Sequence, residues 1–197
     1  MRDGVAERAG RVGVGEFVEG RGFGVVGGGT VGVPDVAGLT HLQFRRFAGC
    51  PICNLHLRSF ARRHGEIAAA GVREVVFFHS PEAELLPHVR DLPFTVVADP
   101  TLRTYREFGV ESGRRALLDP RVWPAIVRGV AVTLWEIARG RKPSPSPHSR
   151  GGRFGLPADF LIAADGRVLA VKYGEHASDQ WSVDELLERA WERGRVG

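Results

Sequence analysis

The sequence predicts an α/β domain with a central mixed sheet flanked by helices. Three apolar, strand-like runs alternate with helical segments, which is the pattern of a parallel sheet covered on both faces. Residues 159–173 then form two apolar runs joined by Asp165-Gly166, a strong signal for an antiparallel hairpin. The chain has 197 residues, 43% of them hydrophobic, which suits one domain with a substantial core.

The first predicted strand and helix surround the two cysteines of the chain. Residues 40–47 favour a strand and residues 54–64 a helix. Gly71 is expected to stop the helical segment. One face of the helix carries residues at the spacing of a buried stripe: Cys53, Leu57, Phe60, Ala61, His64 and Ile67.

Two further strand–helix units follow. Residues 73–79 are almost entirely apolar and predict a strand buried on both faces. Ser80 and Pro81 are expected to be the N-cap and the first residue of a short helix. Residues 94–98 predict a third strand, and residues 99–108 predict a helix that ends at a glycine.

The last predicted element is a helix over residues 183–193. Ser182 and Glu185 have the spacing of a capping box, in which each side chain accepts a hydrogen bond from the backbone of the other. Trp181 and Trp191 are expected to pack this helix against the domain.

The N-terminal segment differs in composition from the rest. Residues 1–38 hold 12 of the 26 glycines, a density that opposes regular structure. We therefore treat residues 1–38 as a Gly-rich extension and residues 39–197 as the domain. A flexible leader is the favoured interpretation. The alternative is a short hairpin formed by residues 16–18 and 23–26.

A basic insertion is predicted before the terminal hairpin, at about residues 110–155. Between positions 112 and 153 it carries nine basic and two acidic residues. Residues 121–139 predict a helix that is apolar around most of its circumference. This helix could flank the protein's own surface, form the contact of a homodimer, or lie on a membrane surface.

Composition excludes several classes of protein. No run of 18 apolar residues is present, so no membrane span is expected, and the first residues lack the apolar region of a secretory signal. We therefore expect a cytoplasmic protein. The net charge of +4 comes from the insertion, and it does not indicate a nucleic-acid partner. In such a chain, two cysteines three positions apart suggest catalysis or metal binding.

Cys50 and Cys53 form a C-P-I-C motif where the predicted strand meets the helix. A helix N-terminus favours the thiolate, which is the reactive form of a cysteine. We expect Cys50 at the exposed N-cap, with Pro51 at the first helical position. Arg46, rather than Arg45, is expected to bring positive charge to the thiol. Cys50 would then attack, and the buried Cys53 would resolve the mixed disulfide or sulfenate without metal or bound cofactor.

A metal site is the alternative use of the same motif. Cys50, Cys53 and His56 have the spacing C-x2-C-x2-H, and His41 is a conceivable fourth ligand. Zinc prefers four ligands, and no second Cys/His pair occurs at regular spacing. A non-enzymatic module that binds a metal or docks a partner therefore stays open.

His79 is a further candidate, at the end of the second predicted strand. Parallel strands place their carboxyl ends at one edge of the sheet, so His79 is expected near Cys50. There it could donate a proton to the leaving thiolate. The alternative is a histidine that caps a backbone group at the strand end.

Four segments of the chain carry a family resemblance: HLQFRRFAGCPICNLHLRSF, REVVFFHS, FTVVADPTLRTYREFGV and GLPADFLIAADGRVLAVKYGEHASDQWSVDEL. On these segments the chain resembles the thioredoxin fold, and within it the peroxiredoxin-like branch of the AhpC/TSA group. The resemblance covers about residues 40–190. It implies a peroxide-reducing or disulfide-exchanging enzyme, regenerated by a cellular dithiol, with Pro157 as a cis-proline opposite Cys50 and Cys53 and with the backbone of Leu156 pairing with the substrate.

Two positions depart from that family pattern. Typical peroxiredoxins carry proline seven residues, and threonine or serine three residues, before the attacking cysteine. This chain has Gln43 and Phe47 there. The hydroxyl that binds peroxide is thus missing, so a general thiol–disulfide reductase without peroxidase activity is the alternative enzyme.

Overall fold

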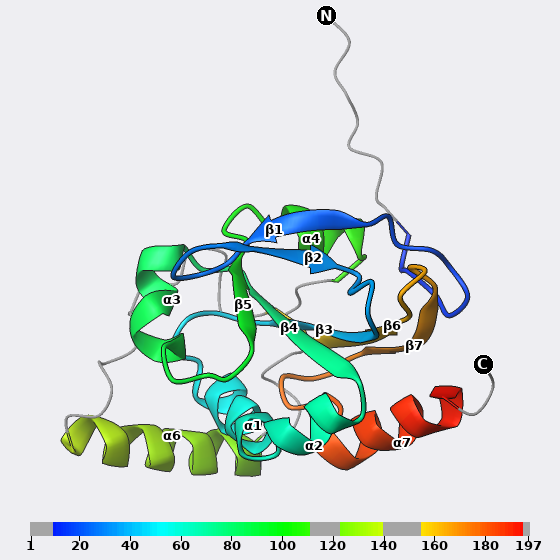
Figure 1. The fold of residues 1–197 in the computed structure, drawn as a ribbon. Helices are drawn as coiled ribbons and strands as arrows, with labels where there is room; N and C mark the ends of the chain where they lie inside the picture. Colours follow the sequence, from blue (N-terminus) through cyan, green and yellow to red (C-terminus); the bar gives the residue numbers. More distant parts are fainter. Residues whose placement is uncertain (1–9, 111–122, 140–154, 195–197) are drawn as a thin grey trace, which may run out of the picture.

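The computed structural model describes residues 10–110, 123–139 and 155–194. Its centre is a mixed sheet in the order β5-β4-β3-β6-β7 (Figure 1). β3, β4 and β5 run parallel, whereas β6 and β7 form an antiparallel hairpin beside β3. The α/β class and the terminal hairpin are thereby confirmed. The strands are β3 (Leu39–Arg45), β4 (Val72–Phe78), β5 (Thr95–Ala98), β6 (Ala158–Ile162) and β7 (Val168–Tyr173).

Helices cover the sheet, with α1, α2 and α7 beneath one face and α4 above the other (Figure 1). The long helix predicted after the cysteines is broken at Arg63, whose backbone (φ −111°, ψ 16°) leaves the helical range between α1 and α2. The helices are α1 (Pro51–Arg62), α2 (His64–Ala69), α3 (Glu82–Val89), α4 (Arg103–Glu107), α6 (Trp123–Ala138) and α7 (Val183–Gly194).

The glycine-rich segment forms part of the fold. β1 (Arg21–Gly24) and β2 (Thr30–Val33) pair as an antiparallel hairpin that lies across the sheet (Figure 1). Phe23 packs edge-on against Phe77 of β4, with ring centroids 4.9 Å apart. The flexible-leader interpretation therefore does not hold for residues 10–38. The alternative, a short hairpin, is confirmed, but its two strands are β1 and β2 and not residues 16–18 and 23–26.

The helix of the insertion, α6, packs against α1. Gly129 allows the close approach, because a Cβ added there would lie 3.0 Å from the backbone carbon and oxygen of Pro51. This agrees with the flank interpretation. Residues 111–122 and 140–154 of the predicted insertion lie outside the described residues. Several large apolar side chains of α6 are exposed: Trp123, Val127, Leu134 and Trp135.

None of the helices in the described ranges is long and apolar enough to cross a bilayer.

The start of α3 differs from the prediction. Pro81, rather than Ser80, is the N-cap, and the helix begins at Glu82. The hydroxyl of Ser80 is used elsewhere, since it accepts a hydrogen bond from the backbone N–H of Ala48 at 2.9 Å. That bond ties the end of β4 to the loop that carries Cys50.

The start of α7 confirms the capping box. The N–H of Glu185 donates to Ser182 Oγ at 3.2 Å, and the N–H of Ser182 donates to Glu185 Oε2 at 2.7 Å. Trp181 is buried against α1 and β3, as expected. The prediction for Trp191 was wrong, because its side chain is 73% exposed on the outer face of α7.

Candidate active site

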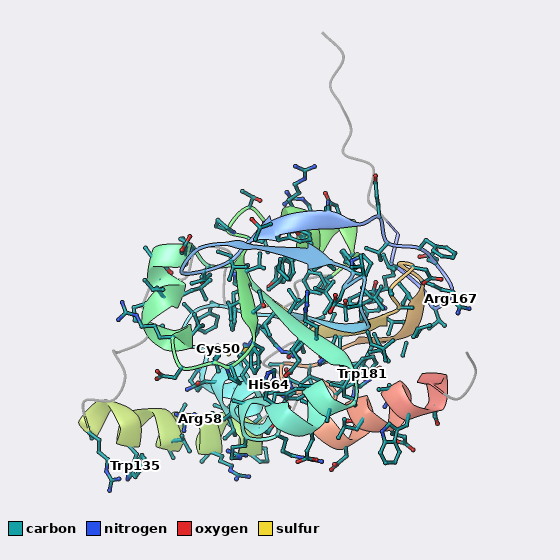
Figure 2. All side chains as sticks on the ribbon, in the orientation of Figure 1. Cys50, Arg58, His64, Trp135, Arg167 and Trp181 are labelled. Carbon is teal, nitrogen blue, oxygen red and sulfur yellow. The ribbon has the colours of Figure 1, made fainter. Side chains whose placement is uncertain are left out.

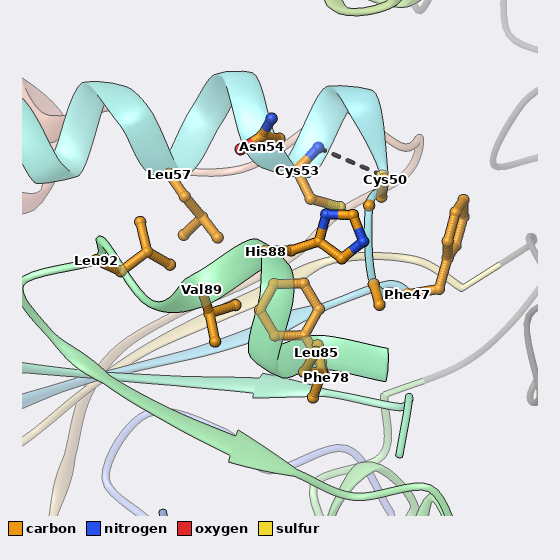
Figure 3. Close-up of a pocket in the computed structure, with 12 residues that line it drawn as sticks. Phe47, Cys50, Cys53, Asn54, Leu57, Phe78, Leu85, His88, Val89 and Leu92 are labelled. Carbon is orange, nitrogen blue, oxygen red and sulfur yellow. Dashed lines mark hydrogen bonds between the residues drawn. The ribbon is translucent and has the colours of Figure 1, made fainter. Parts of the chain in front are cut away.

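The two cysteines lie where β3 leads into α1. Cys50 is the N-cap residue of α1, and Pro51 occupies its first turn, as the sequence predicted. Proline costs nothing there, because that N–H has no partner within a helix. Cys50 Sγ accepts a hydrogen bond from the backbone N–H of Cys53 at 3.3 Å (Figure 3). The sulfur is thus held at the positive end of the helix dipole.

Arg46 supplies a full positive charge to the same sulfur. Its Nη2 donates to Cys50 Sγ at 3.0 Å, and the side chain is buried. The backbone oxygen of Arg46 accepts the N–H of His79 at 3.1 Å, which fixes the position from which the guanidinium reaches the thiol. The expected contact between Arg46 and Cys50 is therefore present.

The predicted exposure of Cys50 was wrong. Cys50 is 1% exposed and Cys53 is 3% exposed. One element far along the chain, α6, covers them: it crosses α1 at Pro51, and its Ile126 packs on the same apolar cluster as both cysteines. The motif could not reveal this cover, because it comes from an insertion more than 70 residues later.

A narrow cavity of about 20 Å³, enough for about one water molecule, reaches the two thiols between α1 and α3 (Figure 3). Most of its wall is apolar. Among the described residues that line the cavity, His88 of α3 is the one ionisable side chain besides the two cysteines. The walls are formed by Phe47, Ala48, Gly49, Cys50, Cys53, Asn54, Leu57, Phe78, Leu85, His88, Val89 and Leu92.

The two thiols ionise as a pair. Burial opposes the thiolate of Cys53, but the hydrogen bond from Cys50 and the charge of Arg46 outweigh it and lower the pKa of Cys53 to about 5. Burial raises the pKa of Cys50 well above its usual value. Because the sulfurs hydrogen-bond each other and Arg46 interacts with both, one proton and one negative charge belong to the pair.

Leu156 and Pro157 lie at the same edge of the sheet as the cysteine loop. β6 begins at Ala158 opposite Phe44, and Gly155 approaches the side chain of Arg46. The expected cis bond was wrong: in the described residues the cis peptide bond is Val33-Pro34. Pro157 instead precedes β6, where its carbonyl accepts the N–H of Gly174 at 2.9 Å, and a trans bond suits that extended position.

The histidine that lines the cavity is not the one that the sequence predicted. His79 is buried beside Arg46 and Gly155, and it is not among the residues that line the cavity. His88, which the sequence did not bring forward, lines the cavity with both cysteines. A spacing of three and four residues puts His88 and Val89 on the same face of α3 as the buried Leu85, and that face is the only sequence signal for it.

A buried polar network beneath α1 was also not predicted. Arg45 pairs with Asp159 at 2.6 Å, and His41 Nε2 lies 3.1 Å from the same carboxylate. Burial alone would raise the pKa of Asp159, but the charge of Arg45 and the contact with His41 hold it well below its usual range. Arg45 also helps to lower the pKa of Cys53, so this network acts on the thiols from the sheet side.

The network continues toward the opposite end of the sheet. Gln43 donates to Glu74 at 3.2 Å, and Glu74 pairs with His64 (labelled in Figure 2) at 2.9 Å. The two histidines considered as metal ligands are held in other contacts, His41 by Asp159 and His56 by Arg45 at 3.0 Å. Within the described part of the chain, no three His, Cys, Asp or Glu residues gather as a metal site.

Comparison with known families identifies the chain. A sequence model of the AhpC/TSA antioxidant enzymes matches residues 59–176. The chain belongs to the AhpC/TSA antioxidant enzyme family. It is thus a thiol-dependent oxidoreductase, as the resemblance implied. The match begins after Cys53, so the roles of the two cysteines depend on the site geometry. No curated protein sequence matches the chain.

Solved structures share the fold. Peroxidoxin BcpB from Mycobacterium tuberculosis is 18% identical, with a TM-score of 0.63 over 91% of this chain and 96% of that one. A peroxiredoxin-like protein from Aquifex aeolicus is 14% identical, with a TM-score of 0.64 over 94% and 90%. A protein described as the thiol:disulfide interchange protein DsbE from Chlorobium tepidum is 17% identical, with a TM-score of 0.57 over 92% and 97%. At these identities the likeness shows the thioredoxin-like fold alone.

Proposed function

We propose that the protein reduces small peroxides with Cys50 and Cys53 as a dithiol pair. The observation that carries this proposal is the contact of Arg46 Nη2 with Cys50 Sγ at 3.0 Å, at the N-cap of α1. The guanidinium and the helix N-terminus stabilise the one negative charge that the two thiols share, and a thiolate is the form that attacks an O–O bond.

The proposed cycle has three steps. The shared proton moves to Cys53, the Cys50 thiolate attacks one peroxide oxygen, the O–O bond breaks, and Cys50 becomes a sulfenic acid. Cys53, one helical turn along α1, then attacks the Cys50 sulfur, which releases water and closes a disulfide. A cellular dithiol reduces that disulfide and restores both thiols. No metal or bound cofactor enters these steps.

The size of the cavity supports a small oxidant. Both thiols are buried, and the cavity that reaches them measures about 20 Å³. Hydrogen peroxide is close to water in size, whereas a protein disulfide would need α1 and its neighbours to separate. For the reductant, the backbone of Leu156 beside Pro157 is the proposed docking strand. The cytoplasm, which keeps thiols reduced, is the proposed compartment.

A general thiol–disulfide reductase is the second candidate. Phe47, which lines the cavity, stands where typical peroxiredoxins carry a hydroxyl, and this observation favours the alternative. Burial of the thiols favours peroxide reduction. The two functions make opposite predictions about the preferred oxidant.

Stopped-flow kinetics separates them. Wild-type protein and Cys50→Ser would be mixed with hydrogen peroxide, and separately with insulin, with dithiothreitol as reductant. We expect rapid loss of peroxide with wild type alone, and slow insulin reduction with both. If wild type and Cys50→Ser consume peroxide equally slowly while wild type reduces insulin, the reductase is the correct function.

A further inference from the structure

The peroxide step of the proposed function is faster with a proton donor in the cavity besides the one proton that the two thiols share. Breaking the O–O bond of hydrogen peroxide releases hydroxide, whose conjugate acid, water, has a pKa of about 15.7. An apolar wall stabilises such an anion poorly. Phe47 offers no proton, and an arginine such as Arg46 can hydrogen-bond but is not deprotonated in proteins.

His88 is placed to supply that proton. It lies in the last turn of α3 and lines the cavity together with Cys50 and Cys53. Figure 3 shows its ring directed from α3 toward the two sulfurs. Leu85 is fully buried one turn earlier on the same helix face, which holds this face of α3 against the cavity.

We propose that His88 is the general acid of the peroxide step and the general base of the resolving step. This inference depends on the proposed peroxide reduction, and it adds a catalytic residue to it. It also gives the cavity a polar group that can face the peroxide, although Phe47 provides none. His79, the histidine expected from the sequence, is instead buried beside Arg46 and Gly155 and does not line the cavity.

The proton balance closes over the two steps. The Cys50 thiolate takes one oxygen of hydrogen peroxide, and the departing hydroxide takes the proton of the His88 imidazolium to become water. Neutral His88 then accepts the proton of the Cys53 thiol. When the Cys53 thiolate displaces hydroxide from the Cys50 sulfur, His88 returns that proton to it. Two thiols and one peroxide thus give one disulfide and two waters.

The leaving group provides a test that a structural role for His88 would not pass. A peracid releases a carboxylate, whose conjugate acid has a pKa of about 4, so its reaction needs no acid catalyst. His88→Gln should lower the second-order rate constant with hydrogen peroxide by about 100-fold and that with peracetic acid by at most about threefold. Arg106→Gln, at an exposed position of α4 on the opposite face of the sheet, is the control and should change neither rate.

Two further measurements make the result decisive. His88→Asn repeats the test in a second variant, and alkylation by iodoacetamide at the wild-type rate shows that the thiol pair is intact. Equal losses with peroxide and peracid, or no loss with either, would overturn the role of His88 while peroxide reduction by wild type stands. Wild type that consumes neither oxidant would overturn the proposed function and this inference together.

Discussion

Replacing Arg46 with methionine should raise the pKa at which the thiol pair becomes reactive. Methionine fills much of the same buried space and removes the charge that lies 3.0 Å from Cys50 Sγ. A hydrogen bond to a charged group contributes about 1.5–3 kcal/mol, and one pKa unit corresponds to about 1.4 kcal/mol. The pKa of the more acidic thiol, Cys53, is about 5 in wild type and should therefore rise by about 1–2 units.

The assay is the pH dependence of alkylation by iodoacetamide, followed by mass spectrometry. In wild type the rate should reach its plateau near neutral pH, because the thiolate is fully formed above its pKa. In Arg46→Met the midpoint should lie at about pH 6–7. The plateau should be a few times higher, because a more basic thiolate is the better nucleophile.

A matched control keeps this result specific. Arg106→Met removes an exposed arginine from α4, on the opposite face of the sheet, and should leave the profile unchanged. If Arg46→Met and Arg106→Met both keep the wild-type midpoint, Arg46 does not stabilise the thiolate. The electrostatic account of the site would then be wrong.

Two other predictions concern the cover of the site and the network beneath it. Gly129→Leu should push α6 away from Pro51 and so speed labelling of the cysteines by a bulky maleimide. The control is Val127→Leu, on the exposed face of α6, and the labelling rate of Gly129→Leu should be at least about tenfold higher. Equal labelling rates in the two variants would exclude α6 as the cover. Asp159→Asn should lower the free energy of unfolding in urea by about 3–5 kcal/mol, because it leaves a buried arginine without its carboxylate. Asp184→Asn, in an exposed ion pair, should cost less than about 1 kcal/mol; similar costs for both would contradict the network. Because the folded-state pKa of Asp159 is lowered, its contribution is present above about pH 4 and is lost as the pH falls further, so the two proteins should converge in acid.

Local signals in the sequence predicted the features that depend on adjacent residues. The cysteine N-cap, the proline after it and the capping box at Ser182 and Glu185 each follow from side chains within four positions of one another. Their physics is that of a helix terminus, where unpaired N–H groups need nearby acceptors. The Asp165-Gly166 turn is equally local.

Features that join distant segments were not predictable in this way. His41, Gln43 and Arg45 alternate with apolar residues along β3, a pattern that resembles a strand with one solvated face. They are buried because Asp159, 114 residues after Arg45, provides a charge partner in space. The burial of Cys50 by α6 and the position of His88 in the cavity likewise depend on tertiary packing.

The central claim is that Cys50 attacks the oxidant and Cys53 resolves it, and mass spectrometry after one equivalent of hydrogen peroxide tests it most directly. Wild type should lose about 2 Da as the disulfide forms, and Cys53→Ser should gain about 16 Da as a sulfenic acid on Cys50. Cys50→Ser should keep its mass. A sulfenic acid on Cys53 in Cys50→Ser, with Cys53→Ser unchanged, would contradict the assignment and reverse the two roles.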